Sequence, residues 1–86
     1  MPEISRFYGI IIRMFYQEHG IPHFHAVYGE YDISVGISPV RFIEGDAPAR
    51  VRSFVAEWAA YNQDALMENW KRCRSGEPIK KIKPLE

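Results

Sequence analysis

The chain has 86 residues and a formal net charge of zero at pH 7, and 47% of its residues are hydrophobic. This length suits one domain and is too short for two, and the apolar content argues against disorder over the whole chain. Zero net charge excludes a general attraction to nucleic acid or membranes, and a single cysteine, Cys73, excludes an internal disulfide and a zinc site built of thiolates. We therefore expect one cytoplasmic domain, residues 1–86, with no signal sequence and no membrane span, because the apolar run Ile10–Ile12 is far too short for either.

The first expected strand spans Phe7 to Tyr16. Its two faces are both largely apolar: one carries Tyr8, Ile10, Ile12, Met14 and Tyr16, and the other carries Phe7, Gly9, Ile11, Arg13 and Phe15. A strand with two apolar faces is buried on both sides, so we expect this one to lie centrally in a sheet. Gly20 and Pro22 then mark residues 17–22 as a loop.

The clearest hairpin joins His23–Tyr28 to Tyr31–Ile37 through Gly29-Glu30, a two-residue turn of the type that has glycine first. This turn fixes a register that places six apolar residues on one face, in the pairs Tyr28 with Tyr31, Ala26 with Ile33 and Phe24 with Val35. The other face then carries His23, His25, Val27, Asp32, Ser34 and Gly36. A short fourth strand, Val40–Ile43, follows the break at Ser38-Pro39.

Apolar residues take a helical spacing from about residue 46 to about residue 75. We expect Asp46 to cap this segment, Pro48 to lie in its first turn and Gly76 to end it, and Tyr61-Asn62 is a point where it bends or splits into two helices. The tail, residues 77–86, alternates apolar and basic residues and is either an edge strand or an arm. The expected fold is therefore α+β: a small antiparallel sheet of three to four strands over about residues 4–44, with a central strand plus the hairpin, packed by one long or two consecutive C-terminal helices.

The candidate site is a cluster of three histidines, His19, His23 and His25. His23 and His25 are two apart in a strand, so both side chains project from one face, about 6.6 Å apart at the backbone. Two such imidazoles can converge on one ion, and His19 in the preceding loop can supply a third nitrogen, as in catalytic zinc sites. The expected ligands of a divalent metal such as zinc are therefore His23, His25 and His19.

The hairpin register adds two neighbours to this cluster. Ser34 lies directly across from His25, and Asp32 lies diagonal to it, so either can hold the imidazole in place. We therefore take His23, His25, Asp32 and Ser34 as candidate binding residues. Two other interpretations stay open: a histidine acting as a general base, and a purely structural role in which His25 bonds Ser34 or Asp32 and His19 is plain surface.

Several short motifs point to one family. They are Ile4–Ile10, Pro22–Ala26 with Tyr28-Gly29, Glu57–Ala59, Glu68–Trp70 and Gly76–Pro78, with Ile82 and Pro84-Leu85 closing the chain. They resemble the bacterial family named domain of unknown function 4160, over nearly the whole chain, and the Pro-His-Phe-His-Ala element is the most specific part. The resemblance implies a small, stand-alone bacterial domain, often encoded beside another small protein in an arrangement similar to toxin–antitoxin pairs, and it brings no known catalytic or ligand residues.

Three functions from different classes remain open at this point. The first is a module that binds a small protein partner or a second copy of itself, such as one half of a two-gene, toxin–antitoxin-like pair. The second is a histidine- or metal-dependent enzyme that acts on RNA through His23 and His25. The third is a nucleic-acid-binding regulator that uses the basic residues after Asn69, among them Lys80, Lys81 and Lys83. We expect the first of these.

Overall fold

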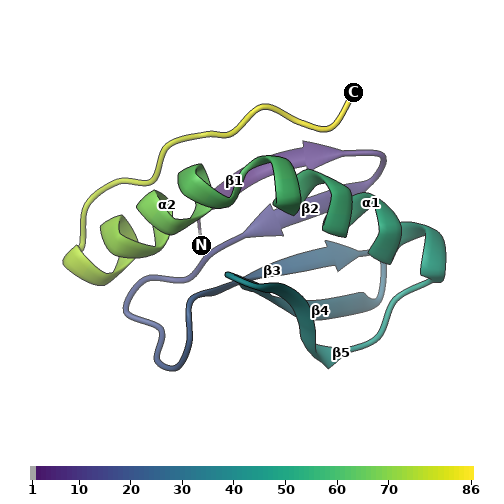
Figure 1. Ribbon diagram of the computed structural model, residues 1–86, viewed down its shortest axis with the longest axis horizontal. Coiled ribbons are helices and arrows are strands. Elements are labelled where there is room, and N and C mark those ends of the chain that lie inside the picture. Colours follow the sequence, from purple (N-terminus) through teal and green to yellow (C-terminus); the bar gives the residue numbers. More distant parts are fainter. Residues whose placement is uncertain (1) are drawn as a thin grey trace.

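The computed structural model describes residues 2–86 as five strands followed by two helices and an extended arm (Figure 1). The strands form one antiparallel sheet in which spatial order follows chain order, β1-β2-β3-β4-β5. Their bounds are β1 Glu3–Phe7, β2 Ile10–Arg13, β3 His23–Tyr28, β4 Tyr31–Ile37 and β5 Val40–Gly45, and the helices are α1 Ala49–Tyr61 and α2 Gln63–Ser75. The architecture is α+β, as the sequence predicts. The sheet has five strands, however, where three to four were expected.

The fifth strand arises because Phe7–Tyr16 is not one continuous strand. Tyr8 and Gly9 both have positive φ angles, 51° and 79°, and they form a tight turn between β1 and β2. Two consecutive positive φ angles match the right-handed twist of the flanking strands, so this pair makes a two-residue hairpin. Tyrosine is an uncommon residue at such a position, and for this reason the apolar run conceals the turn. The predicted central strand is therefore wrong, and β3 occupies the middle of the sheet.

The predicted hairpin of β3 and β4 is confirmed residue by residue. The register pairs Tyr28 with Tyr31, Ala26 with Ile33 and Phe24 with Val35, and Gly29 supplies the positive φ, 57°, that opens the turn. On the opposite face, His25 pairs with Ser34 and His23 with Gly36. This register places His23, His25 and Ser34 on the same face of the hairpin.

The two helices meet at Asn62, where the sequence allows a split. The Asn62 side chain donates from Nδ2 to the Trp58 carbonyl at 2.7 Å, and the helical hydrogen bonding restarts in α2. Gly76 ends α2 in the left-handed conformation, and the Gly76 and Glu77 N–H groups bond to the Cys73 and Arg72 carbonyls. This confirms the predicted helix end.

The predicted start of the helical segment is wrong. The first helix begins at Ala49 after Pro48, and no side chain caps it. Asp46 instead accepts a hydrogen bond from the Ala47 N–H at 2.8 Å, because the extended backbone of Pro48 leaves Asp46 too far upstream to reach the helix.

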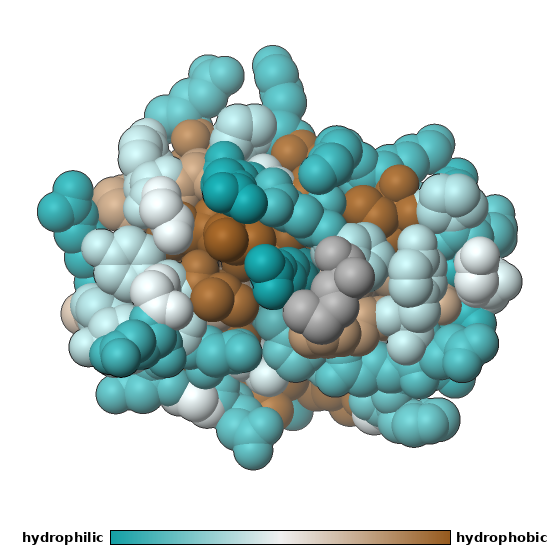
Figure 2. Space-filling model, turned by 180° about the vertical axis from the view of Figure 1, so that it is seen from behind, coloured by the Kyte–Doolittle hydropathy of each residue, from teal (hydrophilic) through white to brown (hydrophobic). Residues whose placement is uncertain are grey.

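Both helices cover the same face of the sheet, and the hydrophobic core lies between the helices and the sheet (Figure 1). Its largest fully buried side chains include Trp58, Phe24, Ile12 and Leu66. The other face has a polar row in which Arg13, His25, Ser34 and Glu44 are consecutive register partners across β2 to β5. Seen from behind, the molecule shows apolar patches set among hydrophilic side chains (Figure 2).

The tail is an arm rather than a strand, and it runs back along the helices (Figure 1). Asn69 holds Lys80 by two hydrogen bonds of 2.8 Å, one to its N–H and one to its carbonyl. Trp58 Nε1 donates to the Lys83 carbonyl, and the Ile82 N–H bonds to the Ile4 carbonyl on β1. The arm therefore covers the β1 edge at one point and closes the core. Neither helix in residues 2–86 has the length and hydrophobicity to cross a bilayer.

Candidate metal centre

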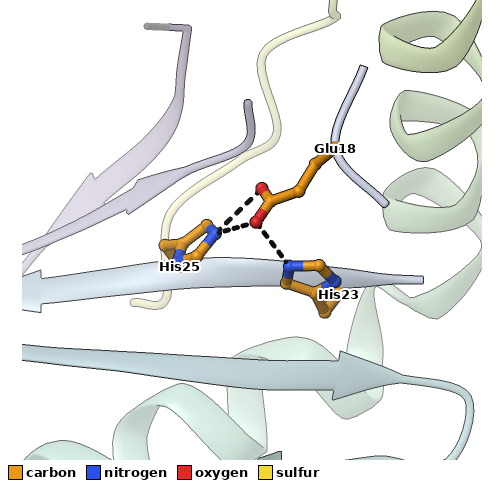
Figure 3. A group of neighbouring side chains, drawn as sticks. All are labelled: Glu18, His23 and His25. Carbon is orange, nitrogen blue, oxygen red and sulfur yellow. Dashed lines mark hydrogen bonds and ion pairs between the residues drawn. The ribbon is translucent and has the colours of Figure 1, made fainter. Parts of the chain in front are cut away.

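Three side chains from two neighbouring elements converge at the start of β3: Glu18, His23 and His25 (Figure 3). His23 Nε2 lies 3.0 Å from Glu18 Oε2, and His25 Nε2 lies 3.0 and 3.1 Å from Glu18 Oε1 and Oε2. One potential ligand atom from each residue lies within 4.8 Å of the other two. The strand periodicity supplies the two imidazoles, and the loop before β3 supplies the carboxylate.

His23 is held in one orientation by its surroundings. Its Nδ1 lies 2.7 Å from the Ile21 carbonyl oxygen, which can only accept, so Nδ1 carries a proton and donates. The ring packs on Trp70 of α2 at 5.2 Å between centroids, and only 11% of the side chain is exposed. His23 therefore lies against Trp70 of α2 rather than out on an open polar face, and its Nε2 is directed at Glu18.

His25 points its Nε2 at the same carboxylate from the next outward position of β3. Its Nδ1 lies 3.4 Å from the Ser34 hydroxyl and 4.0 Å from an oxygen of Asp32. The Phe15 ring packs edge-on against the imidazole at 4.6 Å. With 15% of its side chain exposed, His25 is shielded but reaches solvent.

Glu18 is placed by the loop between β2 and β3. The Gln17 N–H bonds to the Cys73 carbonyl at the end of α2, and Gln17 has a positive φ of 58°, so the backbone turns the next side chain toward β3. Burial raises the pKa of Glu18, but hydrogen bonds with His23 and His25 and their charges outweigh it, and the net pKa lies below its usual value. The carboxylate is therefore ionised at neutral pH.

The hydrogen-bonding pattern leaves a place for a cation. With its proton on Nδ1, a neutral His23 directs the Nε2 lone pair at an ionised carboxylate, and two acceptors 3.0 Å apart repel each other. Either a second proton on His23 or a metal ion between the two atoms removes this repulsion. Donation from a ring Nδ1–H to a backbone carbonyl is the arrangement that prepares histidine as a metal ligand through Nε2.

The residues fit a zinc-like ion. A tetrahedral zinc with ligand bonds of about 2.0–2.2 Å holds neighbouring ligand atoms about 3.3–3.5 Å apart, and two histidines with one glutamate are an established catalytic set that keeps one position open. The observed nitrogen–oxygen separations of 3.0–3.1 Å need an expansion of a few tenths of an ångström, and the two imidazole nitrogens lie within 4.8 Å of each other. A pocket of about 300 Å³ adjoins the three residues, with further walls from His19, Ile21, Ser34, Ile43 and Glu44.

The residues expected from the sequence are placed unequally. His23 and His25 belong to the converging group, and Ser34 and Asp32 lie beside His25 at the distances above. His19 lies in the wall of the pocket, on an exposed part of the loop, and is not in the converging group of residues 2–86. Glu18 is the third member of the converging group, and it was not predicted from the sequence. The sequence feature that could have indicated it is a carboxylate in the same short loop, five residues before His23.

Glu18 should make part of the stability of the metal-free protein dependent on acid. Since its pKa is lower in the folded state, its ionised form adds stability above the unfolded pKa of about 4.3, and this is lost as pH falls from there through the folded pKa. Urea unfolding in EDTA should show the free energy of unfolding of the wild type falling more steeply between pH 5 and pH 3 than that of E18Q. Equal slopes would mean that the two imidazoles do not stabilise the carboxylate.

Comparison with known proteins gives a family and no function. The model of a family described as Domain of unknown function (DUF4160) matches residues 9–71, a span that includes the loop with Glu18, both histidines and the helices as far as Lys71. No curated protein matches the chain, and no solved structure does.

Proposed function

The chain belongs to the DUF4160 family of domains of unknown function, and we propose that it is a metal-binding domain in which Glu18, His23 and His25 hold a zinc-like divalent cation. One observation carries this proposal: His23 donates from Nδ1 to the Ile21 carbonyl while its Nε2 and that of His25 both face one carboxylate. The donor set contains two imidazoles and one carboxylate, and imidazole favours zinc, copper, iron and nickel over magnesium or calcium.

Three such ligands would leave a fourth position free on a tetrahedral ion, and a pocket adjoins the three residues. A zinc ion in such a site lowers the pKa of a bound water to about 7 and thereby favours hydrolysis. The chain itself contributes the orientation of the imidazoles, through Ile21 and Ser34, and the partial exclusion of water by Phe15 and Trp70. An enzyme acting on RNA is the catalytic form of this proposal, and cleavage lost in H25A would test it.

Metal content is the direct test. Untagged protein, stripped with EDTA and dialysed against micromolar zinc, should retain about one zinc per chain by elemental analysis. H23A and H25A each remove a ligand nitrogen, and E18Q replaces the charged carboxylate with a neutral amide, which is a weaker ligand. Each variant should weaken zinc binding by more than about 100-fold, since even partners outside the ligand set are typically worth about 10–100-fold.

Two variants serve as matched controls for the ligand set. H19A removes a histidine in the wall of the same pocket and should bind zinc as the wild type does. S34A removes only the neighbour of His25 Nδ1 and should weaken binding by about tenfold. If the wild type and H25A bind zinc equally, or if neither binds it, the three residues are not a metal site. Their hydrogen bonds then serve only to hold the loop against β3.

A second candidate is a partner-binding module in the cytoplasm, as in a bacterial two-gene pair. The edge strand β5 supports it, because five of its six residues are exposed and Phe42 and Ile43 keep 42% and 43% of their surface accessible. Nucleic-acid binding through Lys80, Lys81 and Lys83 ranks third. The nearby Arg72 is paired with Glu68 and Glu77, so fewer cations of this region are left for phosphates.

A further inference from the structure

The two edge strands of the sheet differ in what covers them. At the β1 edge, the arm approaches and the Ile82 N–H bonds to the Ile4 carbonyl. At the other edge, β5 pairs with β4 alone within the described residues 2–86. An uncovered edge strand presents backbone donors and acceptors that can pair with another strand.

A β-bulge gives this free edge an unusual charge pattern. Glu44 pairs with Ser34 and Phe42 pairs with Val35, so Ile43 is the extra residue of the bulge. Arg41 pairs with Gly36, which lies on the same face as Ser34, because both are register partners of the two histidines. Arg41 and Glu44 are therefore three residues apart and yet share one face of the sheet, with Phe42 and Ile43 between them.

This pattern is complementary to itself, and we propose that two copies of the chain pair antiparallel along β5. A twofold axis between Phe42 and Ile43 brings Arg41 of each copy opposite Glu44 of the other, so the same ion pair forms twice. Opposite charges across an antiparallel pair stabilise it, and like charges destabilise it. Beside the axis, the exposed Phe42 side chains of the two copies lie next to each other on the face of Val35, and the exposed Ile43 side chains lie next to each other on the pocket face, so both pairs lose contact with water.

The dimer would also complete the surroundings of the metal centre. Ile43 and Glu44 line the pocket beside His25, so pairing along β5 brings Arg41 of the second copy to the rim of that pocket. This consequence rests on the proposed metal function, whereas the pairing itself rests only on β5. The test is therefore made in EDTA, where failure of the metal proposal does not affect the result.

Light scattering and sedimentation over a range of protein concentrations measure the oligomeric state. The wild type should be a dimer, and R41E and E44R should each be monomers, with association weakened at least about 100-fold because each variant opposes two like-charge pairs. An equimolar mixture of R41E and E44R should form a heterodimer, because every opposed pair then has opposite signs. K71E, the same charge reversal on an exposed part of α2, should remain a dimer.

Three results would overturn the proposal. A wild type that is monomeric at every concentration would mean that Arg41, Glu44 and the bulge protect the edge against pairing with a second copy. This conclusion would hold even if a different protein were found to bind to β5. Single variants that dimerise like the wild type, or a mixture that stays monomeric although both variants are folded by circular dichroism, would show that β5 is not the interface.

Discussion

Zinc at 1,000 times its dissociation constant should raise the free energy of unfolding of the metal-free protein by about 4 kcal/mol. The proposed ligands come from the loop and from β3, and they converge only when the loop is fixed through Gln17 and Cys73. A chain of 86 residues has a total stability of about 4–13 kcal/mol, so the bound ion would supply a large part of it. Urea unfolding followed by circular dichroism, in buffered zinc and in EDTA, measures the difference.

The variants separate this effect from general destabilisation. In H25A the zinc-dependent shift should fall from about 4 to at most about 1.4 kcal/mol, because a loss of affinity of more than about 100-fold leaves zinc at no more than about ten times the dissociation constant of the variant. H19A should show the full shift, since its histidine is outside the converging group. A zinc-dependent shift in H25A as large as that of the wild type would contradict the proposed ligand set, whatever the stability of the variant in EDTA.

The site could be predicted from the sequence as far as strand periodicity reaches. His23 and His25 share a face because they are two residues apart, and Ser34 lies across from His25 because Gly29 fixes the turn. Loops have no such period. The choice between Glu18 and His19 depends on the positive φ of Gln17 and on its contact with the end of α2, 56 positions along the chain. No local pattern contains that contact.

The fold shows the same division between local and distant causes. The hairpin of β3 and β4 and the end of α2 at Gly76 follow from turn chemistry in the sequence. The turn at Tyr8-Gly9 does not, because a tyrosine takes a position where small or polar residues usually occur. The arm is held by Asn69 and Trp58, which lie 11 and 25 positions from their partners, so its course depends on side chains far from it in the chain.

Replacing Trp58 with alanine should destabilise the protein by about 3–5 kcal/mol, which removes a large part of the stability of a chain of this size. Trp58 is 1% exposed and packs between the sheet and the arm, with ring centroids 5.5 Å from Phe7 and 5.9 Å from Phe24. The variant leaves a cavity and releases the Lys83 carbonyl from its donor. Calorimetry should show the melting temperature falling by more than about 12 °C.

W58F distinguishes the packing of this residue from its role in holding the arm. Phenylalanine keeps most of the aromatic contact with Phe24 but has no Nε1–H, so the Lys83 carbonyl loses its partner at a cost of about 1–3 kcal/mol. If the arm is fixed mainly by hydrogen bonds, W58F should also speed hydrogen exchange of the Ile82 N–H, which bonds to β1. Y61A, on the same helix at 77% exposure, should change stability by less than about 0.5 kcal/mol. A W58F protein with wild-type stability and exchange would mean that apolar contacts of Ile79, Ile82 and Leu85 hold the arm without the tryptophan donor.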